Sequence, residues 1–149
     1  MEKCVFCELP EIKEREIASN NLARAFLTNR PIVSGHTLVI PIRCVQRYEE
    51  LTKNEKEAIE GLRNNITNAL KKSFNAEGFN FSWNDGKMAG QSVAHFHLHI
   101  IPRKDGDTGI TEYEPREFLY RPSKDRPLKP EEELKEVSNT IKNAIGMLN

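Results

Sequence analysis

The chain has 149 residues, which is the usual size of a single domain. Its 22 Lys and Arg residues balance its 22 Asp and Glu residues, so the net charge gives no general attraction to nucleic acid or to an anionic membrane. No run of about 18 apolar residues occurs that could cross a membrane. We therefore expect one globular domain over residues 1–149, with neither a nucleic acid nor a membrane as partner.

Five short segments have the β-branched and aromatic residues, bounded by turn residues, that are typical of strands. The first two flank the turn Ser19-Asn20-Asn21, and the third ends at Pro41. The predicted strands are residues 17–19, 23–27, 36–40, 79–83 and 95–101.

Two longer segments have the apolar spacing of helices. The first runs from Thr52 to Phe74, where Thr52 and Glu55 have the spacing of a capping box. The second begins near Pro130, and its apolar face consists of Leu134, Val137, Ile141, Ile145 and Leu148. Because these helices are few and do not alternate with every strand, we predict an α+β fold with an antiparallel sheet of about five strands and two main helices.

Residues 102–129 form a connection rich in Pro and charge that is long for a compact domain, and such connections are often functional. We treat residues from about 105 to 149 as a C-terminal extension of the domain. Within it, the aromatic residues Tyr113, Phe118 and Tyr120 have two open roles, packing on a partner subunit or covering a pocket.

Three of the four histidines alternate in the segment His95-Phe96-His97-Leu98-His99. On one strand these imidazoles would share a face, about 6.5–7 Å apart. Three interpretations are open: a solvated strand face, a metal site formed by all three, and separate roles in which one imidazole is a nucleophile. Separate roles are favoured because a pleated strand spreads its side chains apart, and because an ordinary histidine pKa of about 6.5 leaves much of the imidazole neutral.

A turn-like segment, Gly90-Gln91-Ser92-Val93, comes directly before the histidines. Glycine permits a close approach of the backbone to a ligand, and backbone N–H groups in such a turn can bind an anion. An ordinary turn leading into a strand is the alternative. Neutral donors beside a nucleophile fit attack on phosphorus, where charge must be held in the transition state.

These blocks resemble the histidine triad (HIT) superfamily, whose signature is His-φ-His-φ-His-φ-φ with φ apolar. The resemblance covers roughly residues 4–104 and is greatest to the branch that contains the fragile histidine triad protein and dinucleoside polyphosphate hydrolases. The matching blocks are residues 29–31, 35–41, 84–86 and 90–101.

The resemblance implies that His97 attacks the α-phosphorus of a nucleotide and forms a covalent nucleotidyl-histidine, which water then hydrolyses. His99 would contact the phosphate or the leaving group, and Gln91 would complete the catalytic set. The substrate-binding residues that the resemblance implies are Asn29, Asn84, Gln91, Ser92, Val93 and His99. It also implies a homodimer whose sheets join, and Mg²⁺ could accompany a polyphosphate substrate.

The motif Cys4-Val5-Phe6-Cys7 has the spacing of half a zinc site, although the same spacing serves redox chemistry and the three cysteines could also be reduced, buried thiols. The motif lies in the N-terminal segment, residues 1–10. The number of cysteines is odd and the N-terminal region is charged, and both features favour a cytoplasmic protein over a secreted one. In zinc-containing relatives the pair is joined by a histidine, here replaced by Cys44, and by the first triad histidine. The resemblance therefore implies a structural Zn²⁺ site of Cys4, Cys7, Cys44 and His95.

The sequence favours hydrolysis or transfer at the α-phosphate of a nucleoside derivative, with a dinucleoside polyphosphate as the expected substrate. One alternative is a purine nucleoside phosphoramidase, which releases an amine from an AMP amide. The size of the leaving group discriminates between the two activities, because a polyphosphate chain needs basic rim residues, for which Arg103 and Lys104 are the candidates unless they are a solvated strand end. Others are a zinc-stapled nucleotide-binding or adaptor protein with vestigial catalysis, and a redox module built on the thiols.

Overall fold

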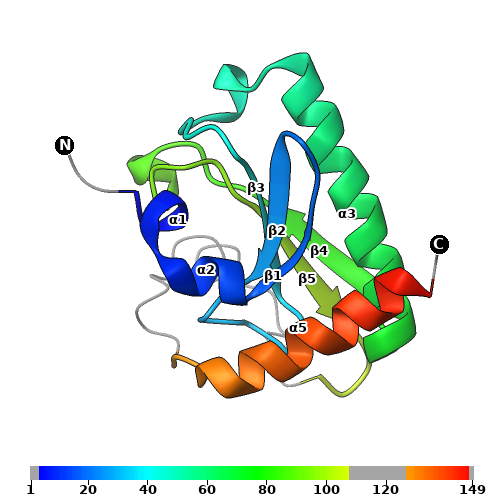
Figure 1. Cartoon of the computed structure of the whole chain (residues 1–149). Coiled ribbons are helices and arrows are strands. Elements are labelled where there is room, and N and C mark those ends of the chain that lie inside the picture. The colour runs from blue at the N-terminus through cyan, green and yellow to red at the C-terminus, as the bar shows by residue number, and fades with distance from the viewer. Residues whose placement is uncertain (1–3, 108–126, 148–149) are drawn as a thin grey trace.

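The sheet is the centre of the fold. A computed structural model describes residues 4–107 and 127–147, and its five strands form one antiparallel sheet in the order β1-β2-β3-β5-β4 (Figure 1). The strands are β1 (Glu16–Ser19), β2 (Ala23–Leu27), β3 (Thr37–Pro41), β4 (Gly78–Ser82) and β5 (Leu98–Arg103). The helices are α1 (Val5–Glu8), α2 (Pro10–Glu14), α3 (Lys53–Phe74) and α5 (Glu131–Gly146), with 3₁₀ turns at Tyr48–Glu50 and Lys87–Ala89. The predicted α+β class is confirmed.

Helix α3 begins where its sequence predicts. The Thr52 hydroxyl accepts a hydrogen bond from the Glu55 N–H at 3.1 Å, and the Glu55 carboxylate accepts one from the Thr52 N–H at 2.9 Å. These two bonds are the capping box, and they satisfy N–H groups that the first helical turn would otherwise leave unpaired. The helix ends at Phe74, and its C-cap residue Asn75 has a left-handed φ of 54°.

The two faces of the sheet have different cores. Long helices α3 and α5 cover one face, where their buried side chains pack with those of the strands. Members of this core include Val39, Ile66, Leu70, Leu98, Ile100, Leu134 and Ile141. On the other face, Phe6 of α1 and Ile12 of α2 pack with a smaller apolar set, which is Phe26, Leu38 and Ile40. Along β3 the buried side chains alternate between these cores, as the pleat requires.

The apolar face predicted for the second helix is confirmed at Leu134 and Ile141, which are buried, and at Val137 and Ile145, which pack against the same core. Leu148 and the aromatic residues at 113, 118 and 120 lie outside the described residues. Among the residues that the structure describes, no helix is both long and apolar enough to span a membrane.

The predicted strand 95–101 is wrong at its start, because β5 begins at Leu98. Ladder pairing joins Val39 to Leu98, and continuing that register would place Phe96 opposite Pro41. The ladder stops at this Val39–Leu98 pair, two residues before Phe96 would face Pro41, and a proline at that position has no N–H to donate. The Phe96 N–H donates instead to the carbonyl of Val45 at 2.7 Å. His95 and His97 therefore lie in an irregular segment before the strand, and only His99 lies on β5.

Candidate active site and metal centre

His97 has its proton placed by one hydrogen bond. Its Nδ1 lies 2.8 Å from the backbone carbonyl of His95, and a carbonyl can only accept, so Nδ1 carries the hydrogen. In the neutral imidazole the lone pair is then on Nε2. The side chain is only 6% exposed, and this burial lowers the pKa of His97 below its usual 6.5, although the bond to His95 opposes the shift. His97 is consequently a neutral base or nucleophile at neutral pH.

Two further rings meet His97. The Phe6 ring lies 5.2 Å from it, centroid to centroid, at 85°, and the His99 ring lies 5.1 Å from it at 66°. Edge-to-face contacts of this kind are favourable between aromatic rings. They orient the His97 ring even though no sheet ladder holds its backbone.

His99 is linked to a histidine that the sequence analysis left outside the site. Nε2 of His36 lies 2.9 Å from Nδ1 of His99, and His36 is fully buried. The Ile32 N–H donates to Nδ1 of His36 at 3.0 Å, so a neutral His36 carries its proton on Nε2 and donates it to His99. A neutral His99 then carries its own proton on Nε2, which makes that atom a hydrogen-bond donor.

His95 faces the cysteines. Its Nε2 lies 2.8 Å from the carbonyl of Pro41 and so carries the hydrogen, which leaves the lone pair on Nδ1. Nδ1 lies 3.3 Å from Sγ of Cys4 and 3.5 Å from Sγ of Cys7. The three triad imidazoles thus have three different partners, which argues against one metal ion shared by all of them.

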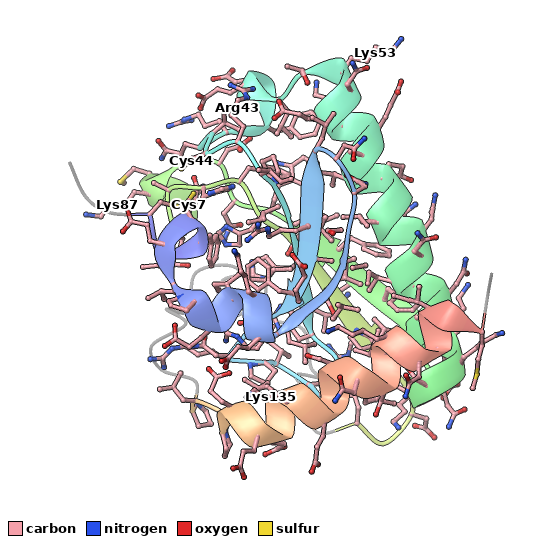
Figure 2. All side chains as sticks on the ribbon, in the orientation of Figure 1. Cys7, Arg43, Cys44, Lys53, Lys87 and Lys135 are labelled. Carbon is pink, nitrogen blue, oxygen red and sulfur yellow. The ribbon has the colours of Figure 1, made fainter. Side chains whose placement is uncertain are left out.

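Four potential ligands come together at this place. The Sγ atoms of Cys4, Cys7 and Cys44 and one nitrogen of His95 all lie within 4.8 Å of one another. Figure 2 labels Cys7 on α1 and Cys44 in the segment after β3. The closeness of the four ligand atoms shows that these two parts of the chain lie side by side. Three sulfurs and one imidazole suit tetrahedral Zn²⁺, and four protein ligands leave no position for a reacting water.

Two of the thiols favour their protonated form when no cation lies among them. Partial desolvation and the neighbouring Cys4 raise the pKa of Cys7 to about 12, and desolvation raises the pKa of Cys44 as well. Crowded thiols therefore resist ionisation unless a positive charge stands among them. A divalent cation provides that charge, because a coordinating thiol loses its proton. The donor set and the bare Nδ1 of His95 fit a zinc ion.

Gln91 makes two hydrogen bonds to backbone. Its Oε1 accepts from the Gly86 N–H at 2.7 Å, and its Nε2 donates to the Gln46 carbonyl at 2.9 Å. The buried side chain therefore joins the turn that contains Gly86 to the segment after β3. Gly90, with a φ of 92°, turns the chain directly before Gln91. After Gln91, the Ser92 side chain is exposed and the Val93 side chain is half-buried.

The remaining predicted residues are more scattered. Asn84 is half-buried at the end of β4, and the carbonyl of Asn29 accepts a hydrogen bond from the Lys129 N–H at 3.1 Å. A cavity of about 420 Å³ beside His36 is lined by Thr28, while Asn29 is not among the described residues that line it.

Arg103 and Lys104, the candidate rim cations, both have partners. Arg103 forms an ion pair with Asp107 at 2.8 Å, and Nζ of Lys104 donates to the Phe74 carbonyl at 3.3 Å. Arg103 is the last residue of β5 and Lys104 follows it, whereas His97 directly precedes the first residue of this strand.

A model of the HIT domain matches residues 9–106 of the chain. The chain belongs to the HIT family. Among curated HIT relatives, bis(5'-adenosyl)-triphosphatase of Dictyostelium discoideum is 35% identical over 133 residues, which covers 88% of this chain and 86% of the relative. The family assignment agrees with the triad segment, and the resemblance found in the sequence is confirmed.

Solved HIT structures have the same fold. A zinc-bound histidine triad family protein from Mycobacterium smegmatis superimposes with a TM-score of 0.75 at 27% identity, covering 98% of this chain and 95% of that one. Diadenosine triphosphate hydrolase of Plasmodium falciparum, solved with cyclomarin A, gives a TM-score of 0.74 at 28% identity, covering 91% and 78%.

Proposed function

We propose that this HIT protein hydrolyses a nucleoside derivative at its α-phosphate, with a dinucleoside polyphosphate as substrate and a nucleotidyl-His97 intermediate. The observation that carries this proposal is the hydrogen bond from Nδ1 of His97 to the His95 carbonyl, which leaves a neutral Nε2 lone pair. Relatives named as triphosphatases and tetraphosphatases of dinucleosides support the substrate class.

The reaction has two steps. Nε2 of His97 forms a bond to the α-phosphorus while the bond from phosphorus to the leaving oxygen breaks, and Nε2–H of His99 donates to that oxygen. Water then attacks the same phosphorus, the N–P bond breaks, and the nucleoside monophosphate leaves with one proton released. The Nδ1–H bond to the His95 carbonyl persists throughout and stabilises the positive charge that develops on the His97 ring.

The other predicted residues have supporting roles in this proposal. Ser92, the Val93 backbone and Gln91 would surround the phosphates, with Gln91 acting through the backbone groups that it holds. Asn29 would contact the ribose, and Asn84 would lie near the nucleotide. Mg²⁺ would enter only as a companion of the polyphosphate, because such ions commonly bind substrate phosphates.

The zinc ion would be structural. Cys7 on α1, Cys4 at its N-cap and Cys44 after β3 would be joined through it to His95, so the N-terminal turn would be tied to the sheet. Cys4, Cys7 and Cys44 form no disulfide, as is usual for cysteines in a reducing compartment, which supports a cytoplasmic location.

A second copy of the chain would pair at β4. This strand is at the edge of the sheet, so one side of its backbone has no strand partner among the described residues. Around it lie exposed aromatic side chains, Tyr48 at 38%, Phe81 at 43% and Trp83 at 42% exposed. A homodimer joined at this edge would cover both the strand and the aromatic surface.

One observation favours the phosphoramidase alternative. Arg103 is neutralised by Asp107 and Lys104 is held by a carbonyl, so neither is placed ready for a long polyphosphate. A chromatographic screen that compares diadenosine tri- and tetraphosphates with an AMP amide tests the choice. Faster turnover of the dinucleotides supports our proposal, and turnover of the amide alone would replace it.

A further inference from the structure

We infer that Phe6 is a positioning residue, which holds the ring of His97 for attack and is itself held by the cysteine cluster. The inference rests on the proposed function. It adds to that function a physical connection between the metal centre and the nucleophile.

The orientation of the His97 ring is only partly fixed by its hydrogen bond. The hydrogen bond to the His95 carbonyl sets the tautomer, but the ring can still tilt about that bond. The Phe6 ring stands almost perpendicular to it, at 85° and 5.2 Å between centroids. With His99 as the second neighbouring ring, Phe6 restricts the directions in which Nε2 of His97 can point.

Phe6 is held in place by contacts outside its own helix. It lies in α1, a single turn of four residues whose N-cap, Cys4, makes no capping hydrogen bond through its side chain. So short a helix has almost no stability of its own. Phe6 is nevertheless buried, and its ring contacts Phe26 at 5.3 Å and His95 at 6.0 Å.

The cysteine cluster lies on both sides of Phe6 in the sequence. Cys4 and Cys7 flank Phe6 in the sequence, and both sulfurs lie within 3.5 Å of Nδ1 of His95. A metal ion held by these atoms would fasten both ends of the turn that presents Phe6. Loss of the ion would release the turn, and the His97 ring would lose one of the contacts that orient it.

The test compares variants of the metal-loaded protein. Phe6→Leu keeps an apolar side chain without the aromatic edge, and Phe6→Tyr keeps the edge. Val5→Ala is the control, because Val5 lies in the same turn but is 42% exposed. Since a misplacement of about 1 Å can reduce a rate 100-fold, we expect Phe6→Leu to lower kcat by ~10- to 100-fold with little change in KM. Phe6→Tyr and Val5→Ala should retain the parent kcat.

Chelation tests the connection to the cluster. It should lower the kcat of the parent to the level of Phe6→Leu and lower that of Phe6→Leu no further, because the two changes remove the same contact. A second readout is independent of turnover: an NMR cross-peak between the ring protons of Phe6 and His97, present in the loaded protein and lost after chelation.

Two results would overturn the inference. A raised KM with unchanged kcat in Phe6→Leu would make Phe6 a wall of the nucleotide pocket. A cross-peak that survives chelation would show that the cluster does not hold Phe6. If the parent protein hydrolyses no nucleotide, the proposed function fails, and the cross-peak still decides whether the cluster controls the contact.

Discussion

His36 and His99 are joined by a hydrogen bond of 2.9 Å although 63 positions separate them in the sequence. Replacing His36 with Phe keeps a buried ring but removes the donor to Nδ1 of His99. His99 can then change tautomer and lose its Nε2–H. We predict a fall in kcat of ~10- to 100-fold for His36→Phe, as loss of a positioned proton donor would give, with a smaller change in KM.

The same variant leaves the Ile32 N–H without its acceptor, which we expect to lower the free energy of unfolding by ~1–3 kcal/mol. Urea denaturation measures that loss, and nitrogen NMR shifts report the tautomer of His99. A variant with parental kcat and an unchanged His99 tautomer would contradict the role that we give to His36.

Cys44 allows a test of the metal centre. Purified protein made with zinc present should contain about one zinc ion per chain, as a four-ligand site holds. Cys44→Ala should reduce metal retention, whereas Cys44→His should restore it because imidazole is also a good zinc ligand. Elemental analysis by mass spectrometry gives the stoichiometry. Metal-free parent protein, or equal retention in Cys44→Ala, would rule out the Cys3His site.

Glu55 predicts how stability changes with pH. The hydrogen bond from Arg43 at 2.7 Å, aided by Thr52, lowers the pKa of this buried carboxyl in the folded state. Its stabilisation is therefore fully present above the unfolded pKa of about 4.3 and is lost as the pH falls through the lower folded pKa.

At pH 7 we expect Glu55→Gln to reduce the free energy of unfolding by about 1 kcal/mol, because the neutral amide loses the ion pair with the exposed Arg43 but can still accept the capping hydrogen bond, and the difference from the parent should shrink in acid. Glu57→Gln is the matched control, since Glu57 is exposed on the same helix. Urea midpoints measured from pH 7 to pH 3 check both. A difference that stays constant over this range would refute the assignment.

Phe81 tests the proposed dimer at the β4 edge. Phe81→Glu places a charge on the exposed aromatic surface and should convert a dimer into monomers. Leu22→Glu makes the same change at the opposite side of the sheet, in the turn between β1 and β2, and should leave the dimer intact. Sedimentation velocity distinguishes the two states. A parent chain that is monomeric at micromolar concentration would exclude this interface.

Local signals predicted much of the fold. The capping box at Thr52 and the apolar stripe of α3 are properties of neighbouring residues, and both are confirmed. The start of β5 was mispredicted because apolar and polar residues alternate beyond the ladder. The pairing ends at Val39 and Leu98, two residues before Phe96 would face Pro41, and only the register of another strand reveals this.

The candidate site was predicted unevenly for the same reason. The cysteine cluster followed from matching motif positions, and the structure brings all four residues together. The contact of His36 with His99 depends on the pairing of β3 with β5, which no local pattern encodes. Gln91 was predicted as a site residue because its side-chain amide can donate a hydrogen bond. The sequence could not show that both the oxygen and the nitrogen of this amide bind backbone groups.

The central claim is that His97 forms a bond to phosphorus. Rapid acid-free quenching of the protein with diadenosine triphosphate, followed by peptide mass spectrometry, should detect a nucleotidyl group on His97 within the first turnover. His97→Ala should form no adduct and turn over several orders of magnitude more slowly while still binding nucleotide. Hydrolysis at the parental rate by His97→Ala, or active parent protein without an adduct on His97, would contradict the account.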